Sequence, residues 1–375
     1  MKVEFFKQNL INKRYANSLK VAVDELICGQ SNIVNGKFSK IFEEKFAKYI
    51  GAKYCAFLSN GLDALTLSLI SIGVGKGDEI IVPNHTYIAT WLSILNLGAK
   101  VIAVPVKNEN LLIDEDKIEA YITEKTKCIV PVHLYGNIAN MKKINEIASK
   151  NNLYVLDDAA QAHGSEENQQ LVGSNSDISA FSFYPTKNLG ALGEAGCVTT
   201  NNLILIKKIK SLRNYGRSEN DIFKNNYLGN NCRGDELQAA FLTSKLDNLN
   251  FIKKERQKLI EKYQESSILN KGKNWELIKY SKGASPHLAI VKLKNLKDRD
   301  KLIDFLLNKS IQTSIHYKLP CHRQPFLNKS QFYIDDFSSK QAQRISNSIL
   351  SLPLSEVHTV EEIEYVINSI NDFFK

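Results

Sequence analysis

The chain has 375 residues, of which 43% are hydrophobic and 24% are charged. These are ordinary values for a folded globular protein, and they exclude disordered and fibrous classes. At about 150 residues per domain, the length predicts two or three domains with ample core. The net charge is +9, but the sequence has no run of five like charges. This scatter favours a solvated surface first, an anionic small ligand next and nucleic acid last.

Targeting and metal signals are both missing from the sequence. No stretch reaches the roughly 18 apolar residues of a membrane span. The first 15 residues, MKVEFFKQNLINKRY, lack the apolar region of a signal peptide, so we expect a cytoplasmic protein without membrane contacts. The six cysteines lie far apart, with no CxxC or HxxxH motif. We therefore predict no metal site, and reduced cysteines that are mostly buried.

From about residue 38 to residue 200, strand-like runs alternate with helical patterns. Apolar residues recur at helical spacing from Phe38 to Tyr49, and Gly51 is placed to end that helix. Such alternation requires crossover connections and predicts an α/β fold, with a mainly parallel sheet covered on both faces. The expected strands are Tyr54–Leu58, Glu79–Val82, Lys100–Val104, Lys127–Val132, Leu153–Asp157, Ile178–Tyr184 and Ala195–Thr199.

The remaining third of the chain has a different composition. A long helical pattern runs from Asp235 to about Ser266, and Lys- and Asn-rich segments follow it. Strands are expected near His287–Leu293 and Ile311–His316. We predict a large domain over residues 1–250, with an N-terminal helical segment, and a smaller α+β domain over residues 251–375.

Ligands of such sheets bind at the carboxyl ends of the strands, so we expect the functional residues at these ends. Ser59-Asn60-Gly61 lies between a strand and a helix, where free N–H groups at the positive helix end suit phosphate. A plain tight turn is the alternative, because any such turn favours Asn and Gly. Asp157 and Asp158 end another strand, and one of them could cap a helix while the other faces a ligand.

The sharpest signal is Lys187. It follows the apolar strand Ile178–Tyr184 and precedes a glycine-rich loop. Burial at such a place lowers the pKa of a lysine and makes it a Schiff-base amine. Ser182 could add a hydroxyl to a phosphate cup, and Tyr87 follows a neighbouring strand. An amine, a strand-end Asp, an anion site and an aromatic ring together meet the needs of pyridoxal 5′-phosphate.

Seven stretches carry a resemblance to a known family. They are Ser59–Leu65, Val82–Thr90, Pro131–Gly136, Asp157–Gly164, Ser182–Gly193, Arg213–Gly216 and Gly229–Ala240. Together they resemble the sugar aminotransferases of the DegT/DnrJ/EryC1/StrS family over essentially the whole chain. The resemblance implies the type I (aspartate aminotransferase-like) fold, pyridoxal 5′-phosphate as cofactor, and a homodimer with shared active sites.

The resemblance also implies roles for residues around the cofactor ring. Lys187 would be the catalytic residue that bonds the cofactor aldehyde. Asp158 would pair with the pyridine nitrogen and Gln161 with the phenolic oxygen. Tyr87 would stack on the ring.

A second group of residues would hold the cofactor phosphate. Ser182 and the backbone amides of Gly61 and Leu62 would grip it, with Asn231 reaching in from the other subunit. The family often has Thr or Ser where Leu62 stands. One phosphate hydroxyl is therefore missing here, and backbone contacts must suffice.

The substrate site is implied less directly. Residues 316–320 resemble the HYPxP loop of the family, but Lys318 replaces the first proline. Tyr184, His316 and Tyr317 are the candidate donors to sugar hydroxyls. A packing or surface role is the alternative for each of them.

The resemblance implies transamination of a nucleotide-linked keto sugar, with glutamate as amino donor. Residues 183–191 look like the branch that aminates C3 of dTDP-linked 3-keto-6-deoxyhexoses, for surface glycans such as O-antigen or for natural products. The product would be dTDP-3-amino-3,6-dideoxyhexose of galacto or gluco configuration. The alternatives are a 4-aminotransferase, a non-catalytic regulatory member, and a sugar dehydratase. The last carries His at the lysine position, so Lys187 argues against it.

Overall fold

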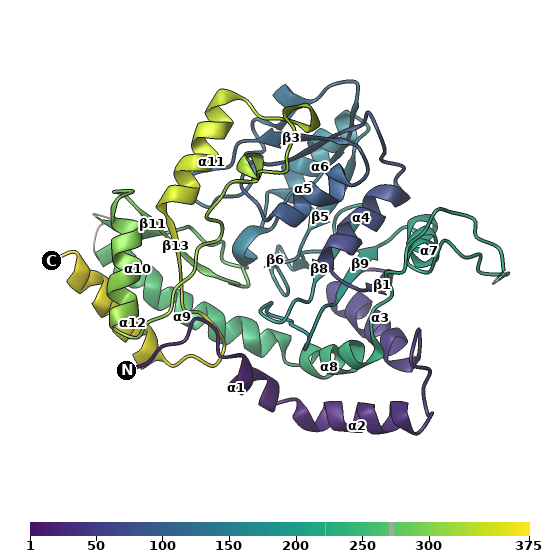
Figure 1. The fold of residues 1–375 in the computed structure, drawn as a ribbon, viewed down its shortest axis with the longest axis horizontal. Helices are drawn as coiled ribbons and strands as arrows, with labels where there is room; N and C mark the ends of the chain where they lie inside the picture. The colour runs from purple at the N-terminus through teal and green to yellow at the C-terminus, as the bar shows by residue number, and fades with distance from the viewer. Residues whose placement is uncertain (222, 270–273) are drawn as a thin grey trace.

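The computed structural model describes residues 1–221, 223–269 and 274–375. Its main feature is an eight-stranded sheet in the order β1-β9-β8-β5-β4-β2-β3-β12 (Figure 1). The strands are β1 Tyr54–Leu58, β2 Glu79–Pro83, β3 Lys100–Val104, β4 Thr126–Ile129, β5 Tyr154–Asp158, β8 Ile178–Ser182, β9 Gly196–Thr200 and β12 Phe332–Tyr333. The neighbours pair in parallel except around β9, which is antiparallel to both β1 and β8. The expected mainly parallel sheet is confirmed, and each of the seven strands expected for it is present.

Helices cover both faces of this sheet. The helices of the first 250 residues are α1 Gln8–Lys13, α2 Ala16–Ile27, α3 Lys37–Ile50, α4 Gly61–Ser71, α5 Ile88–Leu95, α6 Met141–Lys150, α7 Leu203–Leu212 and α8 Glu236–Leu246. One hydrophobic core joins α4, α5 and α7 to one face, and two others join α3, α8 and α6 to the opposite face. Alternate residues of β1 belong to opposite cores, as the two-residue period of a strand requires.

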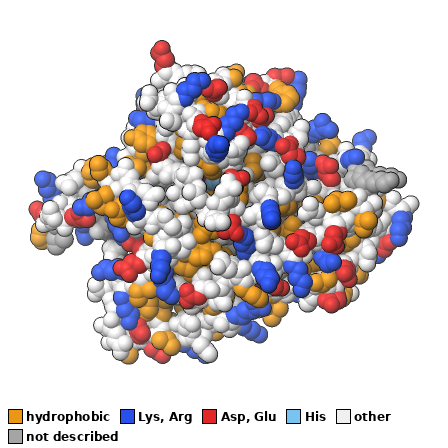
Figure 2. All heavy atoms as spheres, turned by 180° about the vertical axis from the view of Figure 1, so that it is seen from behind, with side chains coloured by type: hydrophobic (Ala, Val, Ile, Leu, Met, Phe, Trp, Pro, Cys, Tyr) orange, Lys and Arg blue, Asp and Glu red, His pale blue; other side chains and the backbone are white. Residues whose placement is uncertain are grey.

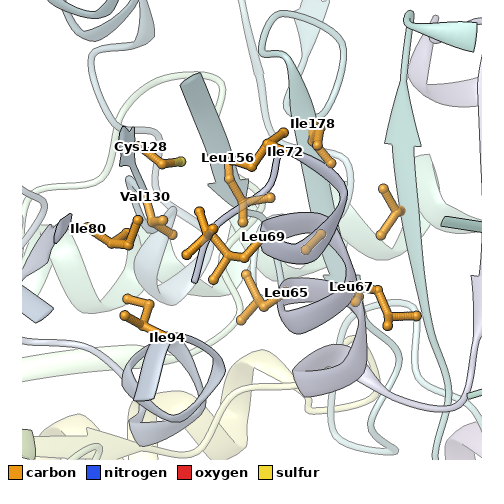
Figure 3. Close-up of a cluster of buried hydrophobic side chains, with 14 of the residues drawn as sticks. Leu65, Leu67, Leu69, Ile72, Ile80, Ile94, Cys128, Val130, Leu156 and Ile178 are labelled. Atoms are coloured by element: carbon orange, nitrogen blue, oxygen red, sulfur yellow. The ribbon is translucent and has the colours of Figure 1, made fainter. Parts of the chain in front are cut away.

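Helix α4 has no exposed residue. Leu65, Leu67 and Leu69 are buried on more than one side, because the sheet, α5 and α7 surround the helix (Figure 3). Asn60 caps its first turn by accepting a hydrogen bond of 2.8 Å from the backbone N–H of Asp63. The buried packing fixes the start of α4 at the edge of the sheet where β1 ends.

The remaining part of the chain forms a second, smaller layer. Its sheet has the order β10-β11-β13, and both pairings are antiparallel. Its elements are α9 Leu249–Leu269, β10 Trp275–Leu277, β11 Ala289–Leu293, α10 Asp298–Asn308, α11 Asp336–Ser348, β13 Ile349–Leu352 and α12 Val360–Phe373. A separate core joins this sheet to α9, α10 and α12. The domain limits at residues 250 and 251 stay a prediction.

Short elements complete the description. They are the two-stranded β6 Glu166–Glu167 and β7 Gln170–Leu171, and the 3-10 helices Ile118–Tyr121, Leu134–Gly136, Cys321–Arg323 and Lys329–Gln331. The segment between α7 and α8 extends away from the main body of the molecule (Figure 1).

Two expectations for the second half differ from the structure. The helical pattern from Asp235 is two helices, because α8 ends at Leu246 and α9 begins at Leu249. The expected strand Ile311–His316 is not continuous. Only Ile311 and Ser314 form isolated bridges, and their partners are Val3 and Ser351. The residues of this segment contact two different segments and do not form one continuous β-ladder.

The surface mixes charges of both signs. Lys and Arg side chains alternate with Asp and Glu side chains over the face shown in Figure 2. Within the described ranges, no helix combines the length and the apolar composition needed to cross a membrane.

Candidate active site

One cavity of about 550 Å³ lies where β1, β2, β5 and β8 end. Ten of the residues singled out in the sequence line it: Gly61, Leu62, Tyr87, Asp158, Gln161, Ser182, Tyr184, Lys187, His316 and Tyr317. Residues far apart in the sequence meet here because the parallel strands deliver their carboxyl ends to one edge.

Lys187 lies in the loop after β8. Its backbone N–H donates a hydrogen bond of 2.8 Å to the carbonyl oxygen of Tyr184, so the chain turns tightly before the lysine. Burial of the amine lowers its pKa to about 8, although the nearby Asp158 carboxylate opposes that shift. A substantial fraction of neutral, nucleophilic amine is therefore present near neutral pH.

Asp158 ends β5 and is buried. Burial raises the pKa of its carboxyl group, while a hydrogen bond from Thr90 and the positive charge of Lys187 act in the opposite direction. The Thr90 hydroxyl donates to Oδ2 at 2.7 Å, and the Ala160 N–H donates to Oδ1 at 3.3 Å. A buried carboxylate with few donors is suited to bind a cationic partner.

Gly61 and Ser182 form a narrow cradle. A Cβ atom at residue 61 would lie 2.6 Å from Cβ of Ser182, which is too close for two carbon atoms. The two segments can therefore approach each other because residue 61 is glycine. The first N–H groups of a helix lack intrahelical partners, and Asn60 caps that of Asp63. The N–H groups of Gly61 and Leu62 are left at the cavity edge for an anion.

Gln161 connects two other residues of the site. Its Oε1 accepts a hydrogen bond of 2.7 Å from the Tyr135 N–H, and its Nε2 donates one of 2.9 Å to the Tyr317 hydroxyl. An amide nitrogen has two protons, so the second remains for a ligand. The ring centroids of Tyr87 and Tyr317 lie 5.3 Å apart, which places two aromatic faces at one side of the cavity.

The segment from Ser285 to His287 is held from two directions. Asn188, next to Lys187, donates hydrogen bonds of 3.1 and 3.0 Å to the carbonyl and hydroxyl oxygens of Ser285. Arg256 donates one of 3.1 Å to the carbonyl oxygen of His287. Arg256 is in turn paired with Glu356 at 3.0 Å, and both side chains are buried.

Asn231 is the one predicted site residue that the structure keeps out of this cavity. It is exposed and forms an isolated bridge with Asn214 in the segment between α7 and α8. Two apolar side chains of the same segment are almost fully in water, since Phe223 is 91% exposed and Leu228 is 97% exposed.

The structure adds residues that the sequence did not reveal. Thr90 lies on helix α5, and its hydroxyl donates a hydrogen bond to Asp158. Its spacing of four residues from Thr86 was the feature of the sequence that could have indicated this role. His287 lines the cavity from a segment that carried no motif, and Glu194 lines it from the glycine-rich loop after Lys187. Among the described residues lining the cavity, Lys187 is the only Lys or Arg.

These residues fit pyridoxal 5′-phosphate. The amine of Lys187 can bond its aldehyde, and the buried carboxyl of Asp158 can pair with its pyridine nitrogen. The cradle at Gly61 and Ser182 can take its phosphate. The aromatic faces of Tyr87 and Tyr317 border the same space.

Comparisons with known proteins agree with this chemistry. A model of the DegT/DnrJ/EryC1/StrS aminotransferase family matches residues 15–371. The dTDP-3-amino-3,6-dideoxy-alpha-D-galactopyranose transaminase of Aneurinibacillus thermoaerophilus is 40% identical over 371 residues, which are 99% of each chain.

Two solved structures have the same fold. DesV from S. venezuelae, in complex with a ketimine intermediate, matches with a TM-score of 0.93 and 31% identity, over 99% of this chain and 98% of that one. NtdA from Bacillus subtilis, with bound cofactor PMP, matches with a TM-score of 0.89 and 28% identity, over 99% of this chain and 85% of that one. The expected type I aminotransferase fold is confirmed.

Proposed function

Because the chain belongs to the DegT/DnrJ/EryC1/StrS aminotransferase family, whose members depend on pyridoxal 5′-phosphate, we propose that it aminates a dTDP-linked 3-keto-6-deoxyhexose to dTDP-3-amino-3,6-dideoxyhexose. The observation that carries the reaction type is the meeting of Lys187 and Asp158 in one cavity. The similarity to the A. thermoaerophilus transaminase along 99% of both chains supports the substrate.

When bound, the cofactor supplies an aldehyde that carries the amino group and a ring that takes up electrons from a broken C–H bond. Lys187 is the catalytic residue of the proposal. It would bond the cofactor aldehyde at rest. Once the amino group of the donor has displaced it, its free amine would take the proton from Cα of the donor and pass it to the cofactor. Its lowered pKa suits this work, because a base is most effective near the working pH.

Asp158, Gln161 and Tyr87 orient the ring. Asp158 holds the proton on the pyridine nitrogen, which makes the ring a stronger electron sink. The second N–H of the Gln161 amide donates a hydrogen bond to the phenolic oxygen of the cofactor. Tyr87 would stack on the ring, since its side chain lines the cavity beside Tyr317.

The phosphate and the sugar take two different regions. Ser182 and the amides of Gly61 and Leu62 bind the cofactor phosphate at the start of α4. Tyr184, His316 and Tyr317 line the same cavity and donate to the sugar hydroxyls.

The proposed assembly is a homodimer in which Asn231 of one subunit completes the phosphate site of the other. Its exposed position outside its own cavity supports this arrangement. The side chains of Phe223 and Leu228 in the same segment are almost fully exposed to solvent, which supports the proposal that a second copy of the chain covers them. Lys187 is the one Lys or Arg among the described residues that line the cavity, and the diphosphate of the substrate would need further positive charges, which a partner subunit could supply.

Glutamate is the proposed amino donor, and the cytoplasm is the proposed location. The amino sugar would serve a surface glycan such as O-antigen, or a natural product. The glutamate donor and the two destinations of the amino sugar rest on the family resemblance.

The deciding experiment offers two ketones to the enzyme. The protein, charged with an amino group by glutamate, is incubated separately with the dTDP-linked 3-keto and 4-keto 6-deoxyhexoses, and products are identified by mass spectrometry. We expect the 3-keto sugar to be converted faster, and Lys187→Ala to convert neither. Conversion of the 4-keto sugar alone would replace the proposal by a 4-aminotransferase. A wild-type protein whose cofactor absorbance does not respond to glutamate would be a non-catalytic member.

A further inference from the structure

The first residues of the chain are fastened to its C-terminal part. Val3 is fully buried and forms a parallel bridge with Ile311. Its N–H donates to the carbonyl oxygen of Ser310 at 2.9 Å, and its own carbonyl oxygen accepts from the Gln312 N–H at 2.9 Å. The segment therefore has a fixed path beside residues 310–312.

Two more contacts hold the backbone on either side of Phe5. The carbonyl oxygen of Glu4 lies 2.8 Å from Nε2 of His358. Two residues after Phe5, Lys7 Nζ lies 2.5 and 2.6 Å from the two carboxylate oxygens of Glu362, in a partly buried ion pair. The position of Phe5 is thus set by its neighbours on both sides.

Phe5 lies against a residue of the active-site cavity. Its ring is stacked on that of His316, with centroids 5.9 Å apart and an interplanar angle of 20°. His316 Nδ1 lies 2.8 Å from the Ser351 hydroxyl, and its carbonyl oxygen accepts a hydrogen bond from the Tyr135 hydroxyl. One ring face, one ring nitrogen and the backbone of His316 are therefore all fixed by protein.

The other ring nitrogen of His316, Nε2, is free. It has no hydrogen-bond partner among the described residues, and His316 lines the cavity. Burial lowers the pKa of the imidazole to about 4, so the ring is neutral at physiological pH. In a neutral imidazole, Nε2 has a single hydrogen-bonding site, which lies in the plane of the ring. The orientation of the ring therefore decides whether Nε2 meets a sugar hydroxyl.

We propose that Phe5 is a positioning residue for His316, so that the N-terminal segment forms the outer support of the substrate site. This inference rests on the proposed function, because it takes the sugar as the ligand of His316. Phe5 itself does not line the cavity. Phe5 also packs against the core that contains Val132 and Leu134, so the test must separate an effect through His316 from an effect through that core.

The test is a double-mutant cycle with Phe5→Ala and His316→Gln in the full-length holoenzyme, with the dTDP-linked 3-keto sugar. Phe5→Ala should raise the KM for the sugar about fivefold to tenfold, because the loss of one hydrogen bond weakens binding by about this factor. The value of kcat should stay within about twofold of wild type. In the His316→Gln background the same change should add nothing, because its target is gone. Phe6→Ala is the matched control, since that ring packs near Ile11 and Phe241 away from the cavity.

An equal rise of KM in both backgrounds would overturn the proposal, as would an unchanged KM in Phe5→Ala. So would a His316→Gln variant with the KM of wild type. A crystal structure of Phe5→Ala gives a readout that needs no sugar. We expect the His316 ring to turn or to adopt several orientations and to lose its Ser351 contact. A single unchanged orientation would refute the positioning role, whichever ketone the enzyme accepts. A wild-type protein that aminates neither ketone would instead refute the proposed function.

Discussion

The hydroxyl of Thr90 donates to Oδ2 of Asp158 at 2.7 Å and lies 2.9 Å from the hydroxyl of Thr86. Thr90 thereby stabilises the ionised carboxylate against the effect of burial. We expect Thr90→Val to raise the pKa of Asp158 further and to lower kcat about tenfold, since hydrogen bonds to charged groups contribute about 1.5–3 kcal/mol. Steady-state kinetics test this. Thr243→Val, which removes a hydroxyl bonded to the Ala239 carbonyl oxygen, should leave kcat unchanged. Equal kcat values for both variants would contradict the role of Thr90.

The lowered pKa of Lys187 predicts a pH dependence. Only the neutral amine attacks an aldehyde, and acid protonates it. The rate at which apoenzyme bonds pyridoxal 5′-phosphate should therefore rise with pH and level off above about pH 8. Absorbance in a stopped-flow series measures it, with Lys187→Arg as the correction for other amines. A rate that keeps rising toward pH 10 would mean that the amine has an ordinary pKa.

The Arg256–Glu356 pair predicts a stability effect. Glu356→Ala leaves a buried guanidinium without its counter-charge, which typically costs about 3–5 kcal/mol. Urea unfolding followed by circular dichroism should show this loss in the free energy of unfolding. Lys340→Ala removes an exposed pair with Asp336 and should cost no more than about 1 kcal/mol. Similar losses in the two variants would speak against a special contribution of the buried pair.

The proposed shared site predicts complementation. Asn231→Ala and Lys187→Ala subunits should each be poorly active as pure dimers. Mixing them under conditions of subunit exchange should form heterodimers with one intact site and restore part of the activity. Activity measured before and after exchange decides the matter. No recovery, with heterodimers shown by native mass spectrometry, would place Asn231 outside the partner's site.

Local patterns in the sequence predicted seven of the eight strands of the main sheet, and the edge strand β12 was not expected. Each of the seven strands expected between Tyr54 and Thr199 is present, because short apolar runs that are bounded by turn residues suit strands buried on both faces. The patterns failed where one segment contacts two distant ones. Ile311 and Ser314 pair with Val3 and Ser351, and such long-range pairing leaves no periodic signal in a short run.

The site followed from the sequence to the extent that its residues end strands. Lys187 and the pair Asp157 and Asp158 were found this way, and the resemblance then selected Asp158; the structure places Lys187 and Asp158 at one cavity. Thr90 ends one of the stretches that carry the resemblance but was given no role there, and His287 was missed because no local pattern distinguishes it from a core residue. The contact of Phe5 with His316 joins residues more than 300 positions apart. Only the folded chain brings such a pair together.

The carbonyl groups of residues 285–287 accept hydrogen bonds from Asn188 and Arg256, and this has a consequence for how the cavity opens. Moving His287 away from Lys187 would break these bonds together, in a buried place where water cannot replace them. That wall therefore behaves as a rigid part of the lysine loop and is a poor hinge. Entry and exit of a bulky substrate are therefore expected to involve other residues around the cavity, such as Tyr87, whose side chain is about half exposed.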